Sequence, residues 1–243
     1  MSGHSKWAQI KRSKGAADAK RGLLFSKLSK KIAIAVREGS SSDPNANYKL
    51  KSAIDYAREQ GLPNDNIDRA IKAATGANAG NLKEIVYEGY GPFGTAFLVE
   101  AATDNPNRTT NNIKHIFSKH NGNLGSQGSV AWQFQTRGQI LVERTKNNLS
   151  DLELAAIDAG AEDVRESPEG LEVYTLPLDL GKIKHILSAA GAKVAQAAII
   201  QESTQGTDLT SEQKPKVDAL FAELEDDEDV IAVHTSANLQ NLW

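Results

Sequence analysis

Residues 139–201 read QILVERTKNNLSDLELAAIDAGAEDVRESPEGLEVYTLPLDLGKIKHILSAAGAKVAQAAIIQ, and this stretch decides the fold. Short apolar runs, typical of strands, alternate in it with longer stretches in which apolar residues recur every three or four positions, as in helices. Each predicted helix ends at a glycine. The order strand, helix, strand, strand, helix, strand is the ferredoxin-like arrangement. The strands are expected at Ile140–Val142, from Val164, at Leu171–Tyr174 and at Val194–Ile200, and the helices at Leu152–Ala159 and around Ile183–Leu187.

The chain on either side of this unit contains the pieces of another sheet. Strands are predicted at Ile85–Tyr87, Thr95–Glu100 and Val130–Phe134, with a helix through Phe117. The last forty residues or so contain one helix and one strand, which is too little core to fold alone, so we expect them to return to this sheet. The expected domains are residues 79–137 together with 204–243, and residues 138–203 as an inserted ferredoxin-like domain.

The amino-terminal third is predicted to be helical. Leu24, Leu28, Ile32 and Val36 recur every four residues, and two further amphipathic helices follow. We expect residues 23–78 to form a three-helix domain and residues 1–22, which contain few apolar side chains, to form a flexible basic arm. The predicted fold class is therefore α/β in the α+β sense, with a three-helix domain and two ferredoxin-like α/β domains, one inserted in the other.

Charge is distributed unevenly along the chain. The formal net charge is only −3, but residues 1–37 contain ten Lys or Arg side chains and one acid, Asp18, and the remaining residues contain 18 basic and 30 acidic side chains. A cationic end on an acidic body is an electrostatic footprint for nucleic acid, because each neutralised phosphate releases counterions. The acidic run from Glu223 to Asp229 is expected to be a solvated turn that repels phosphate and keeps nucleic acid on the far side of the molecule.

The composition of the basic end is also compatible with roles unrelated to nucleic acid. A solvated helix face with a floppy terminus would have the same composition. Binding to a membrane surface is less favoured, because the apolar stripe is needed to pack two partner helices. Mitochondrial presequences are also basic, but they favour Arg, whereas seven of these ten residues are Lys.

The residues give little support for catalysis or a metal. The chain has no cysteine, which excludes disulfides, thiol nucleophiles and thiolate zinc sites. His115 and His120 are five residues apart and would face different sides of a helix, and no glycine-flanked serine elbow occurs. We therefore expect no enzyme activity, no metal and no cofactor. The only sequence support for a hydrolase that uses an interdomain cleft is a set of scattered carboxylates.

Several short motifs resemble the YebC/PmpR family, which includes the mitochondrial translational activator of cytochrome oxidase subunit one. The resemblance runs essentially end to end. The motifs that carry it are Ser2-Gly3-His4-Ser5-Lys6-Trp7, Lys14-Gly15-Ala16, Asp18-Ala19-Lys20-Arg21-Gly22, Asp43-Pro44-Asn45-Ala46-Asn47, Tyr87-Glu88-Gly89-Tyr90-Gly91-Pro92, Arg108-Thr109, Phe117-Ser118-Lys119-His120 and Gly128-Ser129-Val130-Ala131-Trp132. Because the opening motif follows Met1 directly, a cleaved presequence is not expected.

The resemblance implies a three-domain α/β protein with a cleft between domains. Family members are described as DNA-binding transcriptional regulators and as ribosome-associated factors that assist the synthesis of proline-rich stretches. A cytoplasmic location is expected, and a monomer is slightly favoured. Pro106 departs from the family, which usually has a basic residue there, so a phosphate contact at that position is in doubt.

The sequence thus predicts a non-enzymatic, DNA-binding transcriptional regulator that grips phosphates without reading bases. The alternative is a translation factor whose basic arm reaches ribosomal RNA. Neither a helix-turn-helix pattern nor an aromatic RNA-binding pair supports sequence-specific readout. The residues predicted to bind nucleic acid are Lys6, Trp7, Lys11, Arg12, Lys14, Lys20, Arg21, Lys27, Lys30, Lys31 and Arg108.

Overall fold

A computed structural model of the chain describes residues 18–76, 82–145 and 149–238. The described part of its amino-terminal domain, residues 18–76, contains three helices that bury one shared apolar cluster, with Leu28, Ile32 and Leu50 almost fully buried. The first helix begins at Asp18 and not at Leu23, because Ala, Lys and Arg are good helix formers and extend it past Gly22. The helices are α2 (Asp18–Glu38), α3 (Tyr48–Glu59) and α4 (Asn64–Thr75).

The turn between α2 and α3 is held by one buried side chain, Asn47. Its oxygen accepts a hydrogen bond from the Leu50 backbone N–H at 3.0 Å and so caps α3. Its amide donates to the backbone carbonyls of Ala35 and Ser41. One side chain thus joins the end of α2 to the start of α3.

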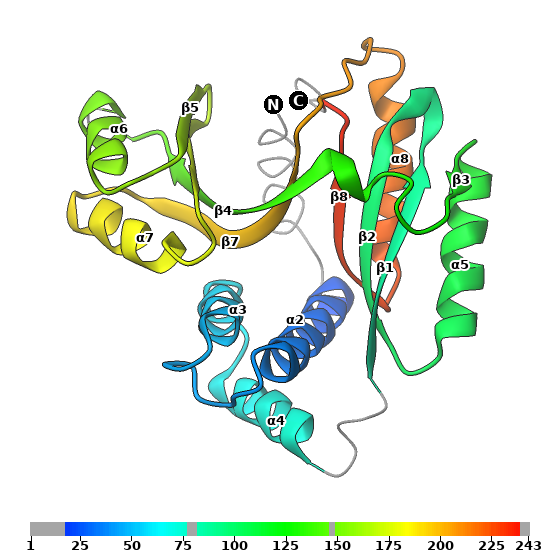
Figure 1. Cartoon of the computed structure of the whole chain (residues 1–243), viewed down its shortest axis with the longest axis horizontal. Helices are drawn as coiled ribbons and strands as arrows, with labels where there is room; N and C mark the ends of the chain where they lie inside the picture. The colour runs from blue at the N-terminus through cyan, green and yellow to red at the C-terminus, as the bar shows by residue number, and fades with distance from the viewer. Residues whose placement is uncertain (1–17, 77–81, 146–148, 239–243) are drawn as a thin grey trace.

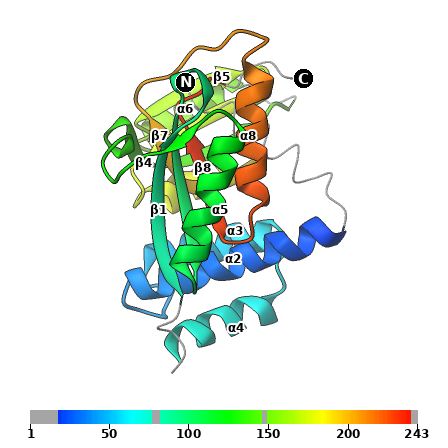
Figure 2. The same ribbon diagram turned by 90° about the vertical axis from the view of Figure 1, so that its right-hand side faces the viewer.

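The first sheet has the strand order β3-β1-β2-β8 and is antiparallel throughout. The last described strand, β8, lies beside β2, so the segment that contains it is part of this sheet. Helices α5 and α8 cover one face (Figure 2), where Phe97 and Phe117 pack edge to face with ring centroids 5.9 Å apart. The elements are β1 (Lys83–Tyr90), β2 (Ala96–Thr103), α5 (Pro106–Lys119), β3 (Asn123–Leu124), α8 (Lys214–Asp226) and β8 (Val230–Thr235).

The second sheet has the order β5-β6-β4-β7 and is also antiparallel. This order, with one helix in each of the two crossovers, is ferredoxin-like. The elements are β4 (Phe134–Glu143), α6 (Leu149–Asp158), β5 (Asp163–Ser167), β6 (Gly170–Thr175), α7 (Leu180–Ala189) and β7 (Val194–Ser203). The predicted fold class is confirmed: a helical domain is followed by two antiparallel α/β sheets.

The predicted strand at Val130–Phe134 is wrong. Residues Ala131–Gln133 form a short 3-10 turn, and β4 starts only at Phe134. The reason is the buried carboxylate of Glu88 on β1, which accepts backbone N–H bonds from Gly128, Val130 and Ala131 at 2.6–2.7 Å. Burial opposes ionisation of Glu88, but these three donors outweigh it and lower its pKa. Those N–H groups therefore cannot pair with a neighbouring strand.

Figure 1 shows the helical domain below the junction of the two sheets. Helix α2 lies against β8 of the first sheet, and α3 lies against β7 of the second. Among the described helices none is both long and apolar enough to span a membrane. The face of α2 that meets the first sheet carries several of the basic residues predicted to bind nucleic acid.

Candidate nucleic-acid interface

The basic residues predicted to bind nucleic acid fall into two groups in the structure. Arg21, in the first turns of α2, is exposed to solvent, and Lys20 belongs to the same helix, although only its backbone is described. The second group, Lys27, Lys30 and Lys31, lies further along α2, where that helix meets the first sheet. Outside the described residues lie Lys6, Trp7, Lys11, Arg12 and Lys14.

The lysines further along α2 turn toward the protein itself. The Lys27 ammonium donates a hydrogen bond to the backbone carbonyl of Glu225 at 2.5 Å. Removal from water lowers the pKa of Lys27 to about 8, although neighbouring acids oppose the change. Lys30 donates to the Glu228 carbonyl and to the Asp229 carboxylate, both at 2.9 Å. These two lysines dock the helical domain onto the end of α8 and the start of β8.

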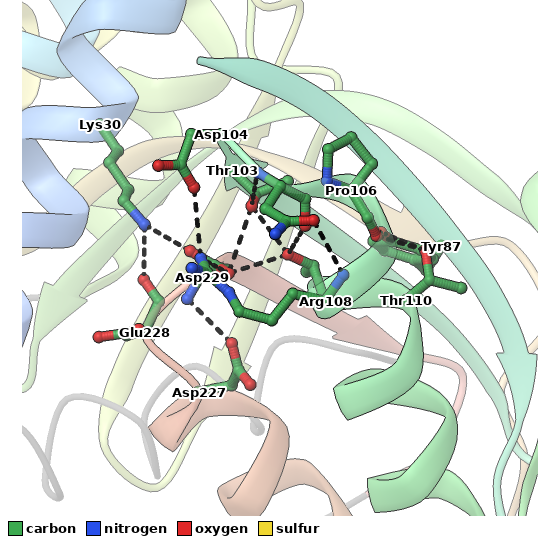
Figure 3. A network of polar contacts seen from close by, with 12 residues as sticks. Lys30, Tyr87, Thr103, Asp104, Pro106, Arg108, Thr110, Asp227, Glu228 and Asp229 are labelled. Carbon is green, nitrogen blue, oxygen red and sulfur yellow. Dashed lines mark hydrogen bonds and ion pairs between the residues drawn. The ribbon is translucent and has the colours of Figure 1, made fainter. Parts of the chain in front are cut away.

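Asp229 is the centre of this contact (Figure 3). Its carboxylate accepts hydrogen bonds from Arg108 at 2.7 Å, from the Thr109 hydroxyl at 2.8 Å and from Lys30. The residue is only 3 % exposed. Burial alone would raise its pKa, but the bonds from Arg108, Lys30 and Thr109 prevail and lower it to about 2. An ionised carboxylate therefore joins α2, α5 and β8.

The expectation for the acidic run is wrong in two respects. Asp229 is buried and paired, and Glu223 accepts bonds from Lys119 and His120 at 2.7–2.8 Å, so these two acids are held within the protein, whereas Asp226 and Glu228 are exposed. Nor does the run lie far from the basic residues, because its carbonyls and one carboxylate contact α2 directly. Attraction between opposite charges stabilises this contact between α2 and the acidic run, which are about 200 residues apart in sequence.

Pro106 suits the helix that it begins. It is the first residue of α5, where a missing N–H costs nothing because helix-start donors have no partner within the helix. The preceding Asn105 caps the helix by accepting from the Arg108 backbone N–H at 3.2 Å. Arg108 is then free to reach Asp229 from the first turn, with Asp104 as a second partner at 3.4 Å. In this conformation Arg108 binds an internal anion.

Sequence reasoning missed the partners of these cations. Thr103 and Thr109 share a hydrogen bond of 2.8 Å and both contact Asp229. The opposite charges of the basic helix and the acidic run were visible in the sequence and could have suggested that the two segments are in contact. Among the described residues no group of three or more His, Asp or Glu side chains is placed to hold a metal ion.

Comparisons with known proteins agree along almost the whole chain. Residues 5–77 match the family model described as the TACO1/YebC protein N-terminal domain, and residues 82–237 match the one described as the TACO1/YebC second and third domain. A protein of Desulfosudis oleivorans is 48% identical over 99% of this chain and 98% of its own length. A protein of Deinococcus radiodurans is 46% identical, with 98% of each chain covered. Both are named "Probable transcriptional regulatory protein".

A solved structure shares the fold. The crystal structure of a conserved hypothetical protein from Aquifex aeolicus superimposes with a TM-score of 0.81 at 38% sequence identity, and 91% of each chain is covered. The similarity therefore extends to the arrangement of the domains as well as to their individual folds.

Proposed function

Because this chain belongs to the TACO1/YebC family, we propose that it is a non-enzymatic, DNA-binding regulator of transcription that holds nucleic-acid phosphates through its cationic amino-terminal region. The observation that carries the proposal is the concentration of ten basic side chains against one acid in residues 1–37. Two of these side chains already bind within the protein, Lys27 to the backbone carbonyl of Glu225 and Lys30 to the carboxylate of Asp229. The contact is therefore assigned to the basic residues that precede Lys27: Lys6, Lys11, Arg12, Lys14, Lys20 and Arg21, with Trp7 as an aromatic neighbour.

The proposal gives a smaller part in phosphate binding to four of the predicted residues: Lys27, Lys30, Lys31 and Arg108. Lys27, Lys30 and Arg108 would have to leave internal partners before they could bind phosphate, and such an exchange yields less free energy than binding by a free cation. Phosphate contacts made by flexible Lys and Arg side chains fix position and carry no sequence information. The proposed binding is therefore strong at low salt and weakly sequence-selective.

The proposal is tested by the salt dependence of duplex DNA binding. Replacing Lys20 and Arg21 together by glutamine should reduce the slope of log affinity against log salt by about 2, roughly one for each lost phosphate contact. The matched control replaces Lys51 and Lys114, which are exposed and lie outside the region. An equal change in both double variants, or none in either, would contradict the assignment.

The same phosphate contact suits ribosomal RNA, so a translation factor is the second candidate. A cationic segment that does not read bases binds either polyanion. Sedimentation of cell lysates separates the two: a transcriptional regulator follows DNA, whereas a translation factor follows ribosomes and is released when residues 1–22 are deleted. No preference for promoter DNA over scrambled DNA at physiological salt would count against specific transcriptional control.

A further inference from the structure

A cavity of about 270 Å³ lies where the three domains meet. Its walls are α2 and α3, the face of the first sheet that α5 and α8 leave uncovered, and strands β4 and β7 of the second sheet. Its lining mixes apolar side chains with charged and polar ones, and concave sites with convergent polar groups commonly hold small ligands. The charged groups of this cavity gather at two separate ends.

One end of the cavity is acidic. Glu38 at the end of α2 and Glu84 on β1 lie close enough to interact, and both are exposed to solvent. Partial removal from water, together with the nearby charges of Glu38 and Glu100, raises the pKa of Glu84 to about 7. The only cation bound at this end among the described residues is Lys49, which lies 2.7 Å from Glu38. Two neighbouring carboxyl groups, Glu38 and Glu84, form a site of negative charge that a ligand cation can occupy.

The other end carries Lys31. Its ammonium lies 5.9 Å from the centre of the Tyr56 ring and, within the part of the chain that the structure describes, makes neither a hydrogen bond nor an ion pair. Burial lowers the pKa of Lys31, although Glu100, Glu225 and Glu84 oppose the change from a distance. Glu100, the acid with the strongest electrostatic effect on Lys31, lies 3.2 Å from His234. A partly buried ammonium without an anion in contact is placed to bind an anionic group in the cavity.

The two ends are about 10 Å apart. Helices α2 and α3 run antiparallel, because Lys31 faces Tyr56 at one end and Glu38 faces Lys49 at the other. Lys31 and Glu38 are seven residues apart on α2, and Lys49 and Tyr56 are seven apart on α3. Seven residues of an α-helix span about 10 Å. A ligand that reaches both ends must therefore be elongated.

We propose that this cavity binds an elongated zwitterion of the basic α-amino acid class, with its side-chain cation between Glu38 and Glu84 and its carboxylate on Lys31. A simple cation would leave Lys31 unpaired, and a simple anion would meet the acidic end. Tyr48 and Tyr56 add aromatic rings on the α3 wall against which a guanidinium or an aliphatic stem packs. Since all three domains supply residues, the occupied cavity fixes their relative positions.

The first experiment measures calorimetric binding of two probes to the full chain, L-arginine and agmatine, which lacks only the carboxylate. Arginine should bind at least about tenfold more tightly, because the carboxylate–ammonium contact is a charge-assisted hydrogen bond. Replacing Lys31 by methionine should abolish the difference, whereas Lys51→Met, at an exposed position on α3, should preserve it. Equal affinities in the native chain, or no saturable binding at about 10 mM arginine, would overturn the proposal.

The second experiment tests the acidic end by pH. A bound guanidinium should favour the ionised form of Glu84, whose pKa is about 7, so affinity should rise as pH increases through 7 and protons should be released in calorimetry. The titratable groups that act on Glu84 are Glu38, Lys49 and Glu100, with Lys31 further away on α2 and His234 on β8, beside the strand of Glu100. Glu84→Gln should flatten the pH dependence, and His234→Gln should leave it in place. Melting curves confirm that each variant is folded. A pH dependence that follows His234 instead would contradict the assignment.

Discussion

Two buried carboxylates, Asp229 and Glu202, each bind two cationic side chains, but they stabilise different parts of the structure. The partners of Glu202 are Arg137 at 2.8 Å and Arg165 at 2.7 Å, all within the second sheet. Those of Asp229 are Arg108 and Lys30, and Lys30 belongs to the helical domain. The same chemistry therefore stabilises one domain in the first case and joins two domains in the second.

The surroundings of the two carboxylates sharpen this contrast. Around Glu202, both arginines also stack on the ring of Tyr174, at 5.1 Å and 4.3 Å, and have further acids in reach. Around Asp229, hydroxyl groups of Thr103 and Thr109 complete the shell. Loss of either carboxylate removes an anion shared by two cations, but only the loss of Asp229 should loosen the contact between domains.

The largest effect is expected for Asp229→Asn. Removing the charge leaves Arg108 and Lys30 without their main anion, which should cost about 3 kcal/mol of unfolding free energy. Chemical denaturation measures the cost, and hydrogen exchange should become faster in α2 as well as in α5 and β8. Unchanged exchange in α2 would show that Asp229 does not join the domains.

Glu202→Gln should cost less, about 2 kcal/mol, because Arg137 keeps Glu162 and Arg165 keeps Asp163. Faster exchange should be confined to the second sheet, in β4, β5 and β7. If α2 also exchanged faster, the two carboxylates would not differ in the way described, and the contact of α3 with β7 would have to transmit the change.

Lowering the pH should remove the contribution of Asp229 to stability within a defined pH range. Its pKa is about 2 in the folded protein and 3.8 in its ordinary state, so its contribution to stability is present above pH 4 and is lost as pH falls toward 2. The free energy of unfolding of the native chain should therefore decline more steeply than that of Asp229→Asn between pH 4 and pH 2. Parallel curves for the two proteins would contradict this role.

Sequence patterns predicted the structural features that are determined by residues close together in the chain. The ferredoxin-like order of the second sheet follows from local apolar periodicity and from glycines that end helices. The strand predicted at Val130–Phe134 failed because Glu88, some forty residues earlier, takes the N–H groups that a strand would use. The basic face of α2 could not be understood locally either, because its partners lie at the other end of the chain.

The smallest effect, and the most direct separation of docking from nucleic-acid binding, is expected for Lys30→Met. Lys30 is partly exposed, at 22 % of its side chain, so its pair with Asp229 should contribute about 1 kcal/mol. Salt screens such a pair, so the difference in stability between native and variant chains should shrink at high ionic strength.

If Lys30 serves mainly to dock the helical domain, DNA affinity should fall no further in Lys30→Met than in Lys51→Met, an exposed control on α3. Hydrogen exchange should meanwhile become faster in α2 and remain unchanged in α5, where Arg108 still binds Asp229. A loss of affinity comparable with that of the Lys20 and Arg21 double variant would place Lys30 among the phosphate ligands. The cationic helix would then have to leave the first sheet whenever nucleic acid binds.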